Sequence, residues 1–347
     1  MVIGLHNTKN PVEEYRVAKS YSPGEYMNRR NFVAACAGLA AVGIHGKLAF
    51  ARSNETIRLV IGFGPGGPID VVARSVAEKL SAAVNKSVIV ENRPGANMLI
   101  AINAVKRSAP DGATFLFGPS TAMTLFVHTK RKLQYDPDAD FVPVAGVATV
   151  PGALAVRNDS PATTLTDYFA AVKAGRIEPM IGVVSLGGAP HIGVIGMGGE
   201  AGLSFTPVPY PGGGGPLVTD LLGGHIPAAA DGAFIALHKA GRARVLAVTT
   251  EERLALIPDV PTFKENGILA YRSFSFGLWA PAGTPAEAMA PVESTIAGLK
   301  TDAALKEKLD QMGILLSPQG SRDFAKTLAQ DRAALGPLVE ASGYKED

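Results

Sequence analysis

The residues best suited to chemistry in this sequence form a glycine-rich loop between a β-branched run and a helical pattern. The loop is Phe63-Gly64-Pro65-Gly66-Gly67-Pro68, followed by Ile69-Asp70. Glycines let backbone N–H groups approach a ligand closely, and a helix N-terminus adds unpaired donors and partial positive charge. The pattern therefore predicts an anion site, with Asp70 capping or orienting the first helical turn. A tight turn that binds nothing is the alternative.

Three more loops follow predicted strands, and two of them, 185–191 and 210–216, also precede predicted helices. They span 118–121, 185–191 and 210–216, and they combine glycines with serine, threonine, histidine and tyrosine side chains. Ligands of open α/β sheets bind outside the carboxyl ends of the strands. The three junctions in which a glycine loop joins a strand to a helix could therefore all direct amide donors into one cleft. The alternative is ordinary loop chemistry, in which glycine only supplies positive φ.

The first loop also satisfies a weak nucleotide-binding pattern. Gly62, Gly64 and Gly67 match the spacing GxGxxG, and Glu91 follows the next predicted strand, where a ribose-binding acid could lie. Against this, prolines at positions 65 and 68 remove N–H donors from the turn that would hold a pyrophosphate, and Arg93 could pair with Glu91. An exported NAD(P)-dependent oxidoreductase therefore remains as an alternative function.

Other enzyme classes are less well supported. The six histidines show neither HExxH nor paired spacing, so no metal site is predicted, and neither Ser120 nor Ser185 lies in GxSxG. Ser185 and His191 could form a catalytic pair, but His191 could equally cap a helix, donate to a ligand carboxylate or lie in the core. We predict a protein that is not an enzyme, with no catalytic residues, metal or cofactor.

The composition indicates a folded protein. Hydrophobic residues make up 47% of the 347 residues and charged residues 18%, which does not fit extensive disorder. The formal net charge of +2 does not favour nucleic acid as a partner. The one cysteine, Cys36, lies in an apolar N-terminal run, so a chain cleaved after that run contains no thiol for a disulfide or a metal site.

The N-terminus resembles an export signal. Arg29-Arg30 precede an apolar run from Phe32 to Ile44, and Ala49-Phe50-Ala51 has the spacing of a signal-peptidase site. The run is too short for a membrane span, which needs about 20 residues. We predict a twin-arginine-type signal peptide cleaved after Ala51 and preceded by an extension, with Met27 as a natural alternative start.

Strands and helices are expected to alternate along the rest of the chain. Predicted strands are 56–63, 87–90, 114–117, 141–150, 153–156, 180–184, 206–209, 228–230, 245–249 and 274–280. Predicted helices are 69–84, 96–108, 164–174 with Thr163 or Thr164 as its cap, 192–201, 216–222, 234–240, 285–300, 303–312 and 321–342. This order predicts an α/β fold of two doubly wound lobes with parallel strands and a ligand cleft between the lobes.

The chain contains two blocks of alternating strands and helices, and its C-terminal part is expected to return to the first lobe. More than one crossover should therefore join the lobes. Residues 1–51 are assigned to the extension and signal peptide, 52–152 and 275–347 to the first lobe, and 153–274 to the second. Hinges are expected near 150–155 and 270–277.

Several motifs follow one another in a fixed order from Ile57 to Gly343. They are IRLVIGFGPGG at 57–67 with Asp70, VIVENRPGA at 88–96, APDG at 109–112, YDP at 135–137, VPY at 208–210, DLLGG at 220–224, LAVT at 246–249, PDVPT at 258–262 and FGLWAPAGTP at 276–285. Taken jointly, this set resembles the Bug family, the extracytoplasmic binding receptors of tripartite tricarboxylate transporters.

The resemblance implies a type II periplasmic binding fold that closes on a carboxylate held by backbone amides and ordered water. It also implies a periplasmic monomer that delivers its ligand to the membrane subunits of a tripartite tricarboxylate-type transporter. Carried over by position, the ligand contacts are Phe63, Gly64, Pro65, Gly66, Gly67, Asp70, Ser120, Thr121, Ser185, His191, Tyr210, Gly212, Gly213 and Asp231. A periplasmic ligand-presenting sensor component would use the same site and is a further alternative.

The chain departs from the family pattern at three positions that concern the ligand. Pro211 stands where a lysine is usual, Gly232 where an asparagine is common, and Gly64 where a proline is frequent. Pro211 supplies neither the cation nor an N–H donor, which makes a tricarboxylate less suitable. We therefore expect a monocarboxylate or small dicarboxylate with an apolar or aromatic body.

Overall fold

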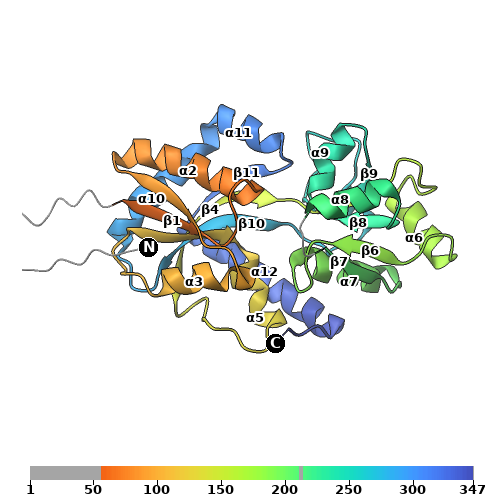
Figure 1. Ribbon diagram of the computed structural model, residues 1–347, viewed down its shortest axis with the longest axis horizontal. Helices are drawn as coiled ribbons and strands as arrows, with labels where there is room; N and C mark the ends of the chain where they lie inside the picture. The colour runs from red at the N-terminus through yellow and green to blue at the C-terminus, as the bar shows by residue number, and fades with distance from the viewer. Residues whose placement is uncertain (1–55, 211–213, 347) are drawn as a thin grey trace, which may run out of the picture. The chain divides into compact units, whose positions relative to one another are not determined.

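The computed structural model describes residues 56–210 and 214–346. The predicted extension, signal peptide and cleavage after Ala51 lie outside these residues, as do Pro211 and two of the predicted contacts, Gly212 and Gly213. The described chain forms two α/β lobes, each built on one β-sheet (Figure 1). The predicted fold class is confirmed, although neither sheet is fully parallel.

The first sheet contains β1 (Ile57–Ile61), β2 (Val88–Asn92), β3 (Thr114–Pro119), β4 (Phe141–Val150), β10 (Phe274–Pro281) and β11 (Leu315–Gly320). Their order is β11-β4-β10-β3-β1-β2. β1 pairs in parallel with β2 and β3, as the βαβ order predicts. β10 lies antiparallel between β3 and β4, and β11 is antiparallel to β4. The expectation of parallel strands is wrong for the pairs that involve β10 and β11. β10 enters the sheet at the edge where β3 ends and therefore runs in the opposite direction to β3.

The second sheet contains β5 (Ala153–Val156), β6 (Met180–Val183), β7 (Thr206–Pro209), β8 (Ala228–Ala230) and β9 (Arg244–Val248). Their order is β7-β6-β8-β5-β9. β6 is parallel to both of its neighbours, whereas β5 is antiparallel to β8 and β9. The chain enters this sheet through residues 151–152 and returns to β10 through residues 249–273.

Helices cover both faces of each sheet (Figure 1). In the first lobe, α2 (Pro68–Val84), α10 (Ala286–Gly298) and α11 (Ala303–Asp310) pack on one face, and α3 (Leu99–Lys106), α4 (Thr121–Thr124) and α12 (Ser321–Ser342) pack on the other. In the second lobe, α6 (Leu165–Lys173) and α7 (Ala189–Ala201) lie opposite α8 (Gly214–Gly223) and α9 (Ala233–Lys239). The short helix α5 (Phe126–Thr129) follows α4, and 3-10 turns occupy Ala96–Met98, Lys264–Asn266 and Leu299–Thr301.

Apolar spacing and capping explain where these helices form. Val72, Val76 and Leu80 recur every four residues of α2 and are fully buried against the first sheet. Burial of each such side chain stabilises the fold by about 1.5–3 kcal/mol. The Thr164 hydroxyl accepts from the Asp167 N–H while the Asp167 carboxylate accepts from the Thr164 N–H, so the predicted cap is a capping box.

The helix predicted over 96–108 begins only at Leu99. Ala96, Asn97 and Met98 have positive φ angles of 48°, 49° and 70°, a conformation that interrupts a right-handed helix. The turn brings Met98 against Gly62, where an added Cβ would lie 2.6 Å from the Met98 Cγ. Close packing against Met98 thus accounts for Gly62, the first glycine of the GxGxxG pattern. Among the described helices, none has the length and hydropathy needed to cross a membrane.

Candidate functional site

The loops that follow β1 and β3 leave the first sheet at one edge. The two strands are parallel, so the loops after Ile61 and Pro119 emerge on the same side. β4 ends there as well, because Val150 pairs with Phe274 at the start of β10. This is the edge from which the chain crosses to the second lobe.

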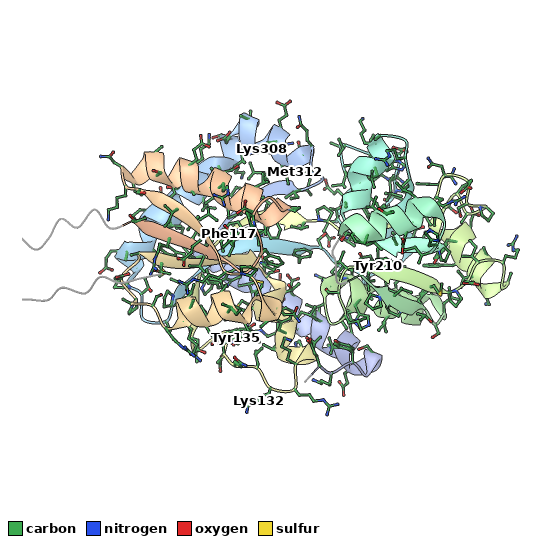
Figure 2. The ribbon with its side chains drawn as sticks, viewed as in Figure 1. Phe117, Lys132, Tyr135, Tyr210, Lys308 and Met312 are labelled. Atoms are coloured by element: carbon green, nitrogen blue, oxygen red, sulfur yellow. The ribbon has the colours of Figure 1, made fainter. Side chains whose placement is uncertain are left out.

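The second sheet presents its loops in the same way. Val183 at the end of β6 and Leu154 near the start of β5 both pair with Ala230, so the loops after β6 and β8 leave the edge at which the chain enters. Tyr210 follows β7 beside them, and Figure 2 shows it within the second lobe. The predicted loops therefore lie on the two edges through which the lobes are connected.

The loop before α2 is held by Asp70, the third residue of that helix. The Asp70 carboxylate accepts from the backbone N–H of Gly66 at 3.0 Å, from Arg74 at 2.8 and 2.9 Å, and from the Asn92 amide at 2.9 Å. These donors, Arg74 above all, lower the pKa of the carboxyl to about 2 despite its burial. Because the Arg74 guanidinium offsets the carboxylate charge, the loop presents its N–H groups without a net negative field.

The loop before α7 is held by His191, the third residue of that helix. The Nδ1 atom of His191 accepts from the N–H of Gly187 at 2.9 Å. The imidazole is 4% exposed, and this burial lowers its pKa below the usual value. The ring is therefore neutral at pH 7 with its proton on Nε2. The structure shows His191 buried, with Nδ1 accepting from Gly187, which precedes the N-cap Gly188, and not from Ser185. Its contact with a ligand stays a prediction.

The loops before α2 and α7 share one construction. In each, a glycine with positive φ (Gly66, 87°; Gly187, 71°) donates its N–H to the side chain four residues later. The next glycine is the extended N-cap, and a proline occupies the first turn of the helix. The first N–H groups of both helices have no intrahelical partner. Two helix N-termini, one from each lobe, thus stand at the connected edges with donors suited to an anion.

Ser120 and Thr121 lie beside this arrangement. The Ser120 hydroxyl accepts from the N–H of Ser275 at 3.0 Å, which ties the end of β3 to the start of β10. Both residues line a small hollow together with Ala189 and Gly193 of α7. The structure therefore brings this predicted pair of the first lobe close to the helix that carries His191.

Tyr210 and Asp231 follow β7 and β8 at the same edge of the second sheet. The Tyr210 hydroxyl donates to Asp220 at 2.9 Å, and burial together with that carboxylate raises its pKa to about 12. The Asp231 carboxylate accepts from the N–H of Ala233 at 2.8 Å. It is partly open to solvent yet lies among many protein atoms, and this desolvation raises its pKa. Phe63 is 40% exposed in the loop that follows β1.

A cavity of about 540 Å³ adjoins the hollow beside Ser120 and Thr121, since residues 272–274 and Asp331 line both. It is bordered by the ends of β4 and β11, by residues 249–255 and by residues 271–275, and the predicted contacts are not among its lining residues. The described part of the chain holds no cluster of three or more histidine, cysteine, aspartate or glutamate side chains that could hold a metal ion.

Sequence reasoning missed two residues that shape the first loop. Arg74 binds Asp70 through both oxygens, and Asn92 donates to Asp70 and to the Phe63 carbonyl. The four-residue spacing of Asp70 and Arg74 on a helix was the available signal. Nothing local indicated Asn92, which reaches Asp70 only because β1 and β2 are paired. Arg93 does pair with Glu91, as expected.

Comparisons with known proteins agree with this architecture. The family model described as the tripartite tricarboxylate transporter family receptor matches residues 72–344. A protein of Bordetella bronchiseptica from the group named UPF0065 is 36% identical over 313 residues, which cover 88% of this chain and 91% of that protein.

Two solved structures are similar over most of their length. An R. palustris protein with adipate has a TM-score of 0.74 and 30% identity, and the match covers 84% of this chain and 98% of that one. The periplasmic binding protein BugD has a TM-score of 0.71 and 25% identity, and the match covers 85% of this chain and 100% of that one.

Proposed function

Because this chain belongs to the tripartite tricarboxylate transporter receptor family, we propose that it binds a small carboxylate between its lobes and delivers it to transporter membrane subunits. The observation that carries the proposal is the matched pair of loops before α2 and α7. Each lobe contributes a helix N-terminus whose N–H donors are free for a ligand carboxylate. No bond is made or broken in this function, and we infer that the protein is a receptor and not an enzyme.

The charges around the loops favour a ligand with one or two carboxylates. Arg74 is the basic residue that contacts the first loop, and its guanidinium is bound to Asp70 and Asn92. Arg272 lines the hollow beside Ser120 and Thr121, but it is paired with Asp331 at 3.4 Å. We therefore infer that recognition rests mainly on N–H and hydroxyl donors, which suit a low ligand charge. Adipate, named with the R. palustris relative, is a linear dicarboxylate of this class.

Apolar surface is available for the body of such a ligand. Phe63 is 40% exposed in the loop before α2, and Leu186 is 41% exposed in the loop before α7. A ligand with an aliphatic or aromatic body would cover both side chains when the lobes close on it. Each such side chain contributes about 1–2 kcal/mol when it is removed from water.

We infer a two-state closure as the mechanism. The lobes are joined by residues 151–152 and 249–273, and we infer hinges near 150–155 and 270–277. A ligand that contacts both lobes at once stabilises the closed form over the open one. Only the closed form would then present the surface that the membrane subunits recognise.

The proposed site of action is the periplasm. The support is the sequence around Arg29-Arg30 and Ala51 together with the periplasmic relative BugD. Expression with the native N-terminus is expected to yield an exported protein that begins at Arg52, as N-terminal sequencing would show. Replacement of Arg29 and Arg30 by lysine should abolish export, and export that persists would rule out the twin-arginine route.

A thermal-shift screen tests the ligand class. The chain from Arg52 to Asp347 is expected to melt several degrees higher with one monocarboxylate or small dicarboxylate, because a ligand at 100 times its Kd adds about 2.7 kcal/mol of stability. Tricarboxylates should shift the midpoint less, and NAD(P) should not shift it. A shift with NAD(P) alone would replace the receptor by the oxidoreductase alternative.

A further inference from the structure

The end of the chain packs against the ligand loop of the second lobe. α12 ends at Ser342, and two residues later Tyr344 places its ring edge-on to the His191 imidazole with centroids 4.8 Å apart at 80°. An added Cβ on Gly187 would lie 2.8 Å from the Tyr344 Cε1 atom. The ring thus covers the two residues whose hydrogen bond holds the loop before α7.

The same segment is anchored in the first lobe two residues later. The Glu346 backbone donates to the Thr129 carbonyl at 2.7 Å and accepts from the Arg131 N–H at 2.8 Å. Its carboxylate binds Lys130 at 3.1 Å and the Asn97 amide at 3.2 Å. The Lys130 side chain is only 7% exposed and Glu346 is 34% exposed, so this ion pair is partly shielded from solvent.

A buried apolar cluster fixes the base of the segment. Leu125 of the first lobe, Ile192 of α7, and Leu335 and Val339 of α12 form one cluster in which each side chain is at most 9% exposed. α12 therefore packs on α7 as well as on the first sheet, and its path from one lobe to the other is visible in Figure 1. The position of Tyr344 is set from both sides, by this cluster before it and by Glu346 after it.

We propose that Tyr344 is a positioning residue for the loop 185–191, so that the C-terminal segment forms part of the ligand site. The expected effect on ligand affinity rests on the proposed function, whereas the effect of the ring on the loop 185–191 can be tested without a ligand. The ring excludes water from the bond between Gly187 and His191, and that bond directs the first N–H groups of α7. Without the ring, water competes for both partners and the donors lose their common direction.

Two variants and two readouts in the ligand-free protein test the positioning role. Tyr344→Ala is expected to speed amide exchange in 185–191 about tenfold, the equivalent of a lost aromatic contact. Tyr344→Phe retains the ring edge and should restore the protection to within about twofold. The ¹⁵N spectrum of His191 should show the Nε2–H tautomer in the wild type and the Phe variant, and a tautomer mixture in the Ala variant. Equal protection and an unchanged tautomer in the Ala variant would overturn the proposal.

A second arm uses adipate as the probe. If adipate binds the wild type, Tyr344→Ala should weaken its affinity about tenfold and Tyr344→Phe should retain it. Absence of adipate binding to the wild type would count against the proposed ligand class and leave the exchange experiment to decide the positioning role.

Should the Ala variant fold poorly, Glu346→Gln is expected to raise exchange in 185–191 by a smaller factor, through a looser anchor. No change with Glu346→Gln would contradict a role of the Glu346 carboxylate in anchoring the ring.

Discussion

Replacement of Asp70 by asparagine is expected to weaken carboxylate binding by at least about tenfold and to lower the free energy of unfolding by about 2 kcal/mol at pH 7. The Asp70 carboxylate is 3% exposed and accepts from Gly66, Arg74 and Asn92. An amide in its place must turn its NH₂ group toward one of these donors. The Arg74 charge is then uncompensated and the Gly66 turn loses its anchor. Calorimetric titration and urea unfolding measure the two effects.

The stability effect of Asp70 depends on pH in a defined direction. Its pKa is about 2 in the folded protein against 3.8 for an ordinary aspartate carboxyl, so the folded state binds fewer protons between these values. The contribution is complete above about pH 5 and is lost as the pH falls toward 2. The difference between wild type and Asp70→Asn should therefore shrink by about 1 kcal/mol from pH 6 to pH 3.

Asp323 provides the matched control. It lies in the first turn of α12, is exposed, and should tolerate asparagine with a change below about 0.5 kcal/mol. A loss of stability equal to that of Asp70→Asn would show that the effect comes from any acid at a helix start. A difference that stays constant with pH would contradict the low pKa of Asp70.

Alanine at Gly193 is expected to destabilise the protein by about 1–3 kcal/mol, although alanine normally favours a helix. Gly193 lies in α7, and an added Cβ would lie 2.8 Å from the Cγ atom of Tyr271. The Tyr271 ring is 3% exposed and packs on Phe263 at a centroid distance of 5.1 Å. The ring could give way only toward the cavity that it lines, which would cost its contact with Phe263. Otherwise α7 must shift, and with it the loop that carries His191.

Gly199 in the same helix gives the opposite expectation. It is exposed and has no atom within 4 Å of an added Cβ, so alanine should stabilise the protein by about 0.5–1 kcal/mol. Urea unfolding of the two variants measures the contrast. Two values of the same sign would show that Tyr271 can move aside. Ligand affinity should fall for Gly193→Ala and stay unchanged for Gly199→Ala.

Local sequence signals predicted most elements, because each had a pattern of its own. The predicted bounds of β4, β5, β7, β8 and α12 are those of the structure. β11 was missed because Leu315–Gly320 contains a proline and a glycine and becomes a strand only by pairing with β4. α4 and α5 were missed because four residues carry no helical period. The antiparallel insertion of β10 could not be predicted, since the order of strands in a sheet depends on contacts far apart in sequence.

The family was recognised correctly from ordered motifs, and the glycine loops were located by their place between strands and helices. The roles of the individual contact residues remain predictions. The role of Tyr344 could not be predicted from the sequence, because its contacts with Gly187 and His191 depend on the path of α12 between the lobes. Short-range patterns indicate which loops can bind, whereas long-range packing decides which side chains support them.

The insertion of β10 between β3 and β4 constrains the order in which the chain can assemble. β10 can take that place only after residues 151–273, which include the whole second sheet, have been brought round. Closing an unstructured loop of that length costs on the order of 4 kcal/mol of chain entropy. The second sheet is contiguous from Ala153 to Val248, so its formation shortens the loop beforehand. The connectivity therefore favours a nascent chain in which the second lobe folds early and the first is completed last, by the segment that begins with β10.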